Sequence, residues 1–191
     1  MTHKQDLVET YRLLRQHGLN DSHSGNASIR DNDTVWITPT GACADTLKQG
    51  DLVACGIDGT SGEHASLDTP LHIAVYQSNP EARCVLHSHG PYTVAITMDG
   101  NDYVPPDFEG AYYFRHVPVL TIPYQDYLDE SPGQVSRSLM KHRIVVVRGH
   151  GAYTCAETIN LAYKWTSSLE SSAKTTFIAK LSGTLPNRNS F

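Results

Sequence analysis

The feature that most constrains this chain is a pair of histidines, His87 and His89, that directly follows the apolar residues Val85 and Leu86. An apolar run of this kind predicts a strand, and side chains two positions apart on a strand share one face. The two imidazoles should therefore point the same way, with Cβ atoms about 7 Å apart, and can close around one cation at Zn–N distances of about 2.0–2.1 Å. The alternative is a half-exposed strand that carries two unrelated histidines.

A third histidine, His150, favours the metal interpretation. It follows the apolar run 144–147, which predicts a buried strand, and Gly149 and Gly151 allow the backbone to turn and approach closely. Three histidines with one open position are typical of a catalytic zinc site, whereas structural zinc sites are normally closed by four ligands. The four cysteines have no paired spacing that would close such a site. The sequence therefore predicts a catalytic metal centre.

Length and charge limit the other possibilities. A chain of 191 residues is most simply one domain over residues 1–191, large enough to bury a core. The net charge of −5, without a cluster of lysine and arginine, argues against a nucleic-acid partner. The first six residues lack the apolar core of a signal peptide, and no run of eighteen apolar residues predicts a membrane span. Together with four scattered cysteines, these features predict a cytoplasmic protein.

The segment before the histidine strand places an acid near the predicted metal. Thr69 and Pro70 are typical of the start of a helix, and Asn79 and Pro80 are typical of its end. Asp68 therefore lies just before a helix that leads back to the histidine strand. It can serve as a metal ligand or a general acid/base, or it can be a plain capping carboxylate.

Other polar or aromatic segments are further candidates for parts of the active site. Residues 104–114, rich in acids and aromatic residues, are expected to form a loop that packs against a neighbour or lines a pocket. Within it, Glu109 is either a proton-transfer group whose pKa an aromatic wall raises, or a solvated loop glutamate. Residues 22–30 and 38–41 are expected to form loops, which are either ordinary turns or segments that present donors to an anion.

The remaining pattern predicts an alternation of helices and strands. His72 is expected to lie on a helix face and not to act as a fourth ligand. Helices are predicted over residues 4–17, 69–78, 91–98, 133–142 and 156–182, and strands over 34–37, 52–55, 85–89, 117–122 and 144–147.

Five motifs, in this order along the chain, give the sequence a specific likeness. They are Ser-Gly-Asn-Ala-Ser at 24–28, Ile-Thr-Pro-Thr-Gly at 37–41, Ser-Leu-Asp-Thr-Pro-x-His at 66–72, His-Ser-His at 87–89 and Gly-His-Gly at 149–151. With them the chain resembles the class II aldolase/adducin family over about residues 5–182. The resemblance implies an α/β fold of three layers, α/β/α, around a largely antiparallel sheet. It also implies a homotetramer with active sites between subunits, and metal ligation by His87, His89 and His150.

The resemblance assigns roles to polar residues as well. The loops that hold the substrate phosphate in the sugar-phosphate members are matched here by Gly25, Asn26, Thr40, Gly41 and Ser66. Two positions depart from the family pattern. Asp68 agrees with the 4-epimerase members, whereas the aldolase members have glutamate, and Leu67 replaces a serine. A tyrosine that aldolase members take from a neighbouring subunit is only approximately matched, by Glu109, Tyr112 or Tyr113.

The chemistry implied by the family has one common step and several outcomes. A divalent ion, zinc in the first place, stabilises the enediolate that forms when a bond next to a carbonyl breaks. The first interpretation is an aldolase-type lyase for a small ketose phosphate or hydroxy-keto acid, with Asp68 or Glu109 moving the proton. The alternatives are a decarboxylase of a phosphorylated 3-keto sugar acid, a pentulose-phosphate 4-epimerase, a dehydratase, and a non-enzymatic scaffold like the adducin branch.

Overall fold

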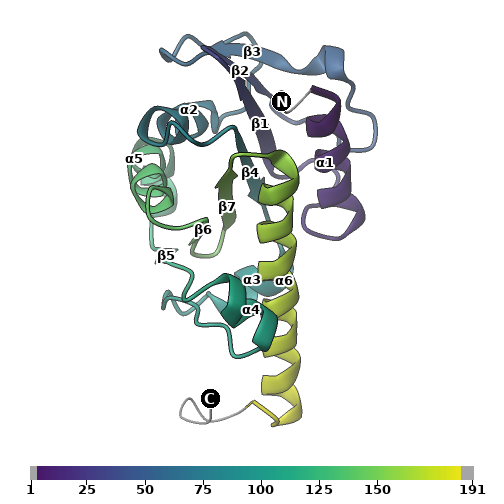
Figure 1. Cartoon of the computed structure of the whole chain (residues 1–191), viewed down its shortest axis with the longest axis vertical. Coiled ribbons are helices and arrows are strands. Elements are labelled where there is room, and N and C mark those ends of the chain that lie inside the picture. Colours follow the sequence, from purple (N-terminus) through teal and green to yellow (C-terminus); the bar gives the residue numbers. More distant parts are fainter. Residues whose placement is uncertain (1–3, 186–191) are drawn as a thin grey trace.

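The computed structural model describes residues 4–185 and contains a seven-stranded sheet flanked by helices (Figure 1). The strands are β1 (Asn26–Asp31), β2 (Thr34–Ile37), β3 (Val53–Gly56), β4 (Cys84–Ser88), β5 (Val119–Leu120), β6 (Ile144–Val147) and β7 (Gly151–Ala156). The helices are α1 (Lys4–Gln16), α2 (Thr69–Ser78), α3 (Pro91–Ile96), α4 (Phe108–Tyr113), α5 (Tyr127–Leu139) and α6 (Ile159–Ser182), with short 3₁₀ helices η1 (Gln49–Asp51) and η2 (Tyr124–Asp126).

The sheet has the strand order β3-β2-β1-β4-β7-β6-β5, and each neighbouring pair is antiparallel except β5 and β6. The histidine strand β4 thus lies in the middle, between β1 and β7, and all five of its residues are buried. A strand in this position is covered on both faces, which explains why it begins with the apolar run Cys84-Val85-Leu86.

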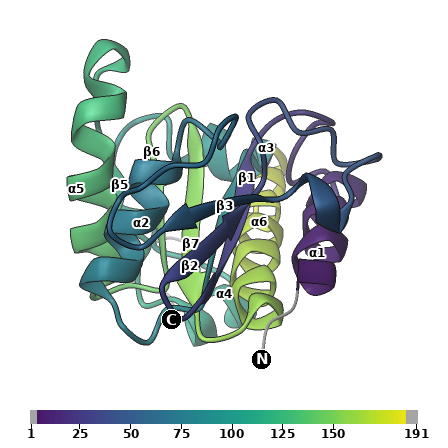
Figure 2. The same ribbon diagram turned by 90° about the horizontal axis from the view of Figure 1, so that it is seen from above.

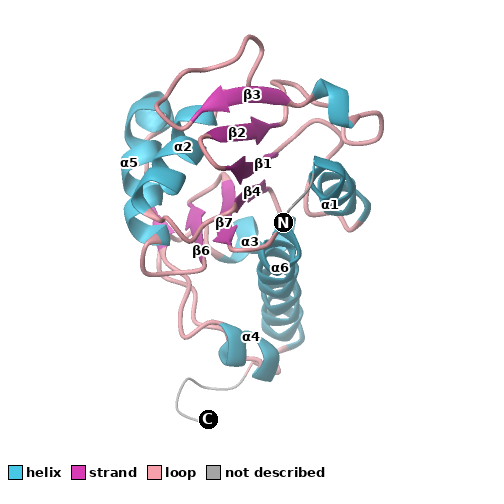
Figure 3. Cartoon of the chain, turned by 45° about the horizontal axis from the view of Figure 1, so that its top comes forward, coloured by secondary structure: helices cyan, strands magenta, loops and turns pink. Residues whose placement is uncertain are grey.

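Helices cover both faces of the sheet. Figure 2 shows α2 and α5 on one side and α1 and α6 on the other. Val75 of α2 and Val145 of the sheet belong to the first core, and Leu7 of α1, Leu86 and Ala162 to the second. Figure 3 shows α4 beside α6, at the end of the molecule away from β3. The predicted α/β/α fold with a largely antiparallel sheet is confirmed.

The best-predicted elements are helices with clear periodicity and a glycine stop. In α1, Leu7, Val8, Tyr11 and Leu14 share one face and are all buried. The helix ends before Gly18, whose φ of +69° is left-handed and suits glycine at a helix end. The long helix α6 ends in the same way, at Gly183 with φ of +70°. Among residues 4–185, no helix combines the length and the apolar character that crossing a membrane requires.

The expectation of a loop over residues 22–30 is wrong in its second half. Residues 26–31 form β1, an inner strand whose first four residues are buried. Small polar side chains occur there because they bond to the helical layer: Ser28 Oγ lies 2.7 Å from His72 Nδ1 and 2.7 Å from the Tyr76 hydroxyl. The small polar residues of this segment led to the prediction of a loop. They form a strand instead, because buried hydrogen bonds satisfy their side chains.

Two helices differ from the prediction as well. The segment expected as a loop over 104–114 contains α4, whose first turn is capped by Asp107, because its carboxylate accepts a hydrogen bond from the Gly110 N–H. Helix α5 begins at Tyr127, six residues before the predicted start, and carries Pro132 within it. Pro132 is the sixth residue of α5, so α5 lacks the hydrogen bond that an N–H at this position would donate to the Leu128 carbonyl. The strand predicted over 117–122 is reduced to Val119 and Leu120.

Candidate metal and substrate site

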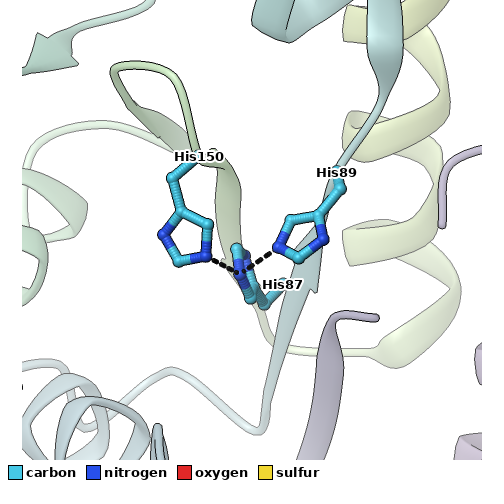
Figure 4. Close-up of side chains that lie close together, drawn as sticks. All are labelled: His87, His89 and His150. Atoms are coloured by element: carbon cyan, nitrogen blue, oxygen red, sulfur yellow. Dashed lines mark hydrogen bonds between the residues drawn. The ribbon is translucent and has the colours of Figure 1, made fainter. Parts of the chain in front are cut away.

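Strand β4 and the turn between β6 and β7 bring His87, His89 and His150 together (Figure 4). His87 Nε2 lies 2.8 Å from His89 Nε2 and 3.2 Å from His150 Nε2. The structure therefore places the three imidazoles as their spacing in the sequence predicts. Their role as metal ligands stays a prediction.

Glycines make this convergence possible. Gly149 has a left-handed φ of +70°, which turns the chain after β6 and directs His150 back toward β4. A Cβ on Gly151 would lie 2.7 Å from Cδ2 of His89, closer than packed atoms come. The two glycines around His150 thus provide the turn and the close approach that the sequence predicted.

All three imidazoles are uncharged at neutral pH, the form in which a histidine nitrogen can bind a cation. His87 Nδ1 lies 3.1 Å from the Ala152 carbonyl, so Nδ1 carries the proton and Nε2 keeps its lone pair. Burial, together with the neighbouring histidines, holds the pKa of His87 well below its ordinary value. Burial and His150 lower the pKa of His89 to about 4, and burial lowers the pKa of His150. The protons that would compete with a metal are therefore absent at neutral pH.

The donor set fits a divalent cation such as zinc. Two tetrahedral ligands with Zn–N bonds of about 2.0–2.1 Å stand about 3.4 Å apart. The Nε2 atom of His87 lies 2.8 and 3.2 Å from those of His89 and His150, and the donor atoms of all three histidines lie within 4.8 Å of one another. Without a cation, unprotonated Nε2 atoms at these distances would direct lone pairs at one another. The backbone hydrogen bond of His87 is the kind of outer contact that orients a metal-binding imidazole.

Asp68 lies beside this cluster, at the N-cap of α2, with Oδ2 3.9 Å from His87 Nε2. Its Oδ2 accepts hydrogen bonds from Asn26 Nδ2 and the Tyr153 hydroxyl, both at 2.8 Å, and its Oδ1 accepts one from the Tyr127 hydroxyl at 2.9 Å. A carboxylate can accept about four hydrogen bonds, so one position on Oδ1 remains. The Asp68 side chain makes no capping hydrogen bond to the helix backbone, so the plain capping role considered for this carboxylate is not what the structure shows.

The environment keeps Asp68 ionised. Burial alone would raise its pKa, but the electrostatic influence of His87 and the hydrogen bonds from Asn26 and Tyr153 outweigh burial and lower the pKa to about 2. The same carboxylate, together with burial, raises the pKa values of Tyr127 and Tyr153, so both phenols keep their protons. The Tyr153 ring also stacks on His87, with ring centroids 4.0 Å apart.

A cavity of about 900 Å³ opens onto the histidines and Asp68. Its polar part includes every position that the resemblance assigned to phosphate binding, namely Gly25, Asn26, Thr40, Gly41 and Ser66, and also His23 and Ser24. Its rim carries three exposed apolar side chains, Leu67, Tyr124 and Leu128, and Arg148 contributes a positive charge. Leu67, which replaces a serine, is 70% exposed and faces this cavity.

Glu109 is the predicted site residue that the structure does not bring to the cavity. It lies exposed on α4, which packs against α6. A catalytic role for Glu109 would therefore require the site of a neighbouring copy and stays a prediction. His72 is buried against Ser28, outside the histidine cluster, as expected.

Sequence reasoning missed Tyr127 and Tyr153 as site residues. Tyr127 lies between the strand predicted over 117–122 and the helix predicted over 133–142, and Tyr153 lies in β7, a strand that was not predicted. Their contact with Asp68 depends on the pairing of β4 with β7 and on the packing of α5 against α2. Two features of the sequence could have indicated Tyr153 as a site residue. It lies three positions after His150, and it is the one large side chain in the run of small residues 151–156.

Comparison with known proteins shows the family to which the chain belongs. The family model "Class II Aldolase and Adducin N-terminal domain" matches residues 5–177. A 3-oxo-tetronate 4-phosphate decarboxylase of Haemophilus influenzae is 27% identical over 187 residues, which cover 93% of this chain and 88% of the relative. An L-fuculose phosphate aldolase of Methanococcus maripaludis is 26% identical, covering 91% and 95%.

Solved structures show the same relationship. The crystal structure of L-fuculose-1-phosphate aldolase from Thermus thermophilus superposes with a TM-score of 0.86 at 28% identity, covering 95% of this chain and 96% of the other. The relatives named here are lyases, an aldolase on one side and a decarboxylase on the other. The chain belongs to the class II aldolase and adducin N-terminal domain family and is one of its metal-dependent lyases.

Proposed function

We propose that this protein is a zinc-dependent aldolase that cleaves a small ketose phosphate or hydroxy-keto acid between the carbons α and β to its carbonyl group. The observation that carries the proposal is an ionised Asp68 with one unused acceptor position, 3.9 Å from a nitrogen of the three-histidine cluster. In an aldol cleavage a base must remove a hydroxyl proton while a cation stabilises the charge that develops at the carbonyl. The site has a candidate for each task.

His87, His89 and His150 would hold the cation, which supplies Lewis-acid stabilisation of the enediolate when it is bound. Asp68 Oδ1 would accept the proton of the substrate hydroxyl. Tyr127 lines the cavity and holds Asp68 Oδ1 in place, while Asn26 and Tyr153 occupy Oδ2. These contacts fix the orientation of the carboxylate, which is how a positioned base gains efficiency.

The polar part of the cavity is the proposed phosphate subsite. Ser24 and Thr40 offer hydroxyl groups there, and Gly41 has open space where a Cβ would stand, so a ligand can approach its backbone. Asn26 differs, because its Nδ2 is occupied by Asp68 and its buried Oδ1 has no partner. We therefore assign Asn26 to orienting Asp68 and the hydroxyls of Ser24 and Thr40 to the phosphate.

A second reaction is favoured by Arg148. Arg148 is among the residues that line the same cavity, and its Nε donates a hydrogen bond to the Met98 carbonyl at 2.7 Å. A phosphorylated 3-keto acid carries a second anion, the carboxylate that leaves as CO₂, and a cation at this place would bind it. Decarboxylation uses the same stabilisation of an enediolate, so it is the alternative reaction.

Two further properties belong to the proposal. We propose a homotetramer, a state supported by the family resemblance and by the exposed Phe108 and Tyr112 on α4, which would also bring Glu109 to another surface. A location in the cytoplasm is supported by the four cysteines, all of which are free.

The test is metal analysis of the purified protein combined with product analysis. Zinc-loaded protein is incubated with dihydroxyacetone phosphate and small aldehydes, and separately with phosphorylated 3-keto acids and pentulose phosphates. Formation of a carbon–carbon bond supports the aldolase. Release of CO₂ would replace it by the decarboxylase, and interconversion of pentulose phosphates by the epimerase. A protein without stoichiometric metal and without turnover would overturn the enzymatic proposal.

A further inference from the structure

Asn20, between α1 and β1, contacts the backbone of two proposed metal ligands at once. Its Oδ1 accepts a hydrogen bond from the His89 backbone N–H at 2.8 Å, and its Nδ2 donates to the His87 carbonyl at 3.4 Å. The side chain is 5% exposed, so both bonds are protected from water. One amide therefore spans the His87-Ser88-His89 stretch.

This contact matters because the sheet does not extend to His89. Strand β4 ends at Ser88, where the pairing with β7 stops at Ala152. The His89 N–H is instead shared between Asn20 Oδ1 and the Leu19 carbonyl, each at 2.8 Å. The place of the His89 imidazole relative to His87 thus depends on residues 19 and 20, more than sixty positions earlier in the chain.

Gly25 leaves the space that the Asn20 amide occupies. It has a left-handed φ of +68°, and a Cβ there would lie 2.5 Å from the His87 carbonyl oxygen and overlap Asn20 Nδ2. The glycine of the Ser-Gly-Asn motif is therefore needed at this point to let the amide reach β4. A larger residue would push Asn20 away from the histidine backbone.

We infer that Asn20 is a positioning residue for the metal centre, which holds His89 beside His87 so that their Nε2 atoms converge before a cation arrives. This inference rests on the proposed metal site. Outer contacts of this kind commonly change metal affinity by about 10–100-fold when they are removed. Asn20 itself is neither a ligand nor a group that touches the substrate.

The experiment measures metal affinity and ligand geometry in Asn20→Ala. Cobalt(II), titrated into metal-free protein, reports tetrahedral coordination through its visible absorption, and competition with a chelator gives the zinc dissociation constant. We expect the zinc dissociation constant to rise about 10–100-fold and the cobalt bands to weaken or shift. A purely structural role would lower the melting temperature and leave both readouts unchanged.

The matched control is Tyr103→Phe. This substitution removes two buried hydrogen bonds, to Ser172 and Thr176, from a tyrosine whose core cluster contains none of the three histidines. It should lower stability without changing zinc affinity or the cobalt spectrum. A similar loss of affinity in this control would show that general destabilisation explains the effect of Asn20→Ala, and would overturn the inference.

The outcomes separate this inference from the proposed function. Wild-type protein that binds neither cobalt nor zinc would overturn the metal site itself. Wild-type binding with an Asn20→Ala affinity within twofold and an unchanged spectrum would overturn the role of Asn20 alone. If Asn20→Ala does not fold, hydrogen exchange of the metal-free wild-type protein tests the inference instead. The His89 backbone amide should exchange as slowly as the amides of β4. Fast exchange of this amide would contradict the inference.

Discussion

At the scale of single residues, Asp68 is the position where substitution should affect chemistry most. Its carboxylate accepts three hydrogen bonds and has one unused acceptor position, and Asp68 lines the cavity. Asp68→Asn keeps the shape of the side chain but removes its capacity as a base. Turnover should fall by about 10²–10⁴-fold, the usual contribution of a general acid/base, while zinc affinity changes less than about tenfold.

Steady-state kinetics and a zinc competition assay on Asp68→Asn check this prediction. Asp129→Asn, an exposed position on α5, is the control and should leave both quantities unchanged. A wild-type rate in Asp68→Asn would remove this residue from the mechanism.

A second residue couples stability to pH. His72 is fully buried with Nδ1 bonded to Ser28, and burial lowers its pKa to about 4, although Asp68 acts in the opposite direction. In the unfolded chain its pKa is about 6.5. Below pH 6.5 the unfolded state binds a proton that the folded state refuses until about pH 4, so stability is full above pH 6.5 and is lost as the pH falls toward 4.

The expected slope from His72 is about 1.4 kcal/mol per pH unit in that window. Urea unfolding of metal-free protein at pH 5, 6 and 7 measures it, and His72→Gln should reduce the slope by about this amount. Tyr76→Phe loses a hydrogen bond to the same Ser28 without removing the imidazole, so it should lower stability and keep the slope. An unchanged slope in His72→Gln would show that other groups carry the pH dependence.

At the scale of elements, the junction between α3 and α6 stabilises the region that follows the histidine strand. Glu170 of α6 accepts hydrogen bonds from the Tyr92 and Thr93 N–H groups and from the Thr93 hydroxyl, at the first turn of α3. A Cβ on Gly90 would overlap this carboxylate, so a larger residue before α3 would displace the Glu170 side chain. One side chain thus caps a neighbouring helix across the tertiary structure.

Glu170→Ala should therefore lower the free energy of unfolding by about 1–3 kcal/mol, because it leaves the N–H groups of α3 without this acceptor. Chemical denaturation provides the measurement. Ser171→Ala, exposed on the next position of α6, should change stability by less than about 0.5 kcal/mol. Equal stability of the two variants would contradict the capping role.

Much of this fold could be predicted from the sequence where one signal decides the structure. The periodic face of α1 with its glycine stop, the apolar run of β6 and the His-x-His spacing were sufficient. The sequence failed for β1 and β7, whose small or polar residues become buried only because both faces of the sheet are covered. The sequence also did not predict that Tyr127 and Tyr153 belong to the site, because their contact with Asp68 requires three elements that are distant in sequence.

At the scale of the whole molecule, one continuous sheet joins the segments that build the site. This continuity supports a single domain over residues 1–191, which stays a prediction. Zinc that binds the folded state alone should stabilise it by about 2.7 kcal/mol at a free concentration 100 times its dissociation constant. For a domain of this size the melting temperature should rise by about 5–10 °C, and a chelator should reverse the rise.

Scanning calorimetry with and without zinc checks that expectation. The double variant His89→Gln and His150→Gln is the control, because both side chains are only partly buried and their loss should leave a folded protein. Zinc should not shift its melting temperature. A shift of the same size in this variant would mean that zinc binds elsewhere.

The place of the histidines in the strand order has a consequence for folding kinetics. His87 and His150 are 63 positions apart, and they meet only when β4 pairs with β7. A loop of that length closes late in folding, because its entropy must be lost before the contacts form. Zinc present during refolding should therefore leave the folding rate almost unchanged and should slow unfolding, which makes metal occupancy a determinant of how long each folded molecule persists.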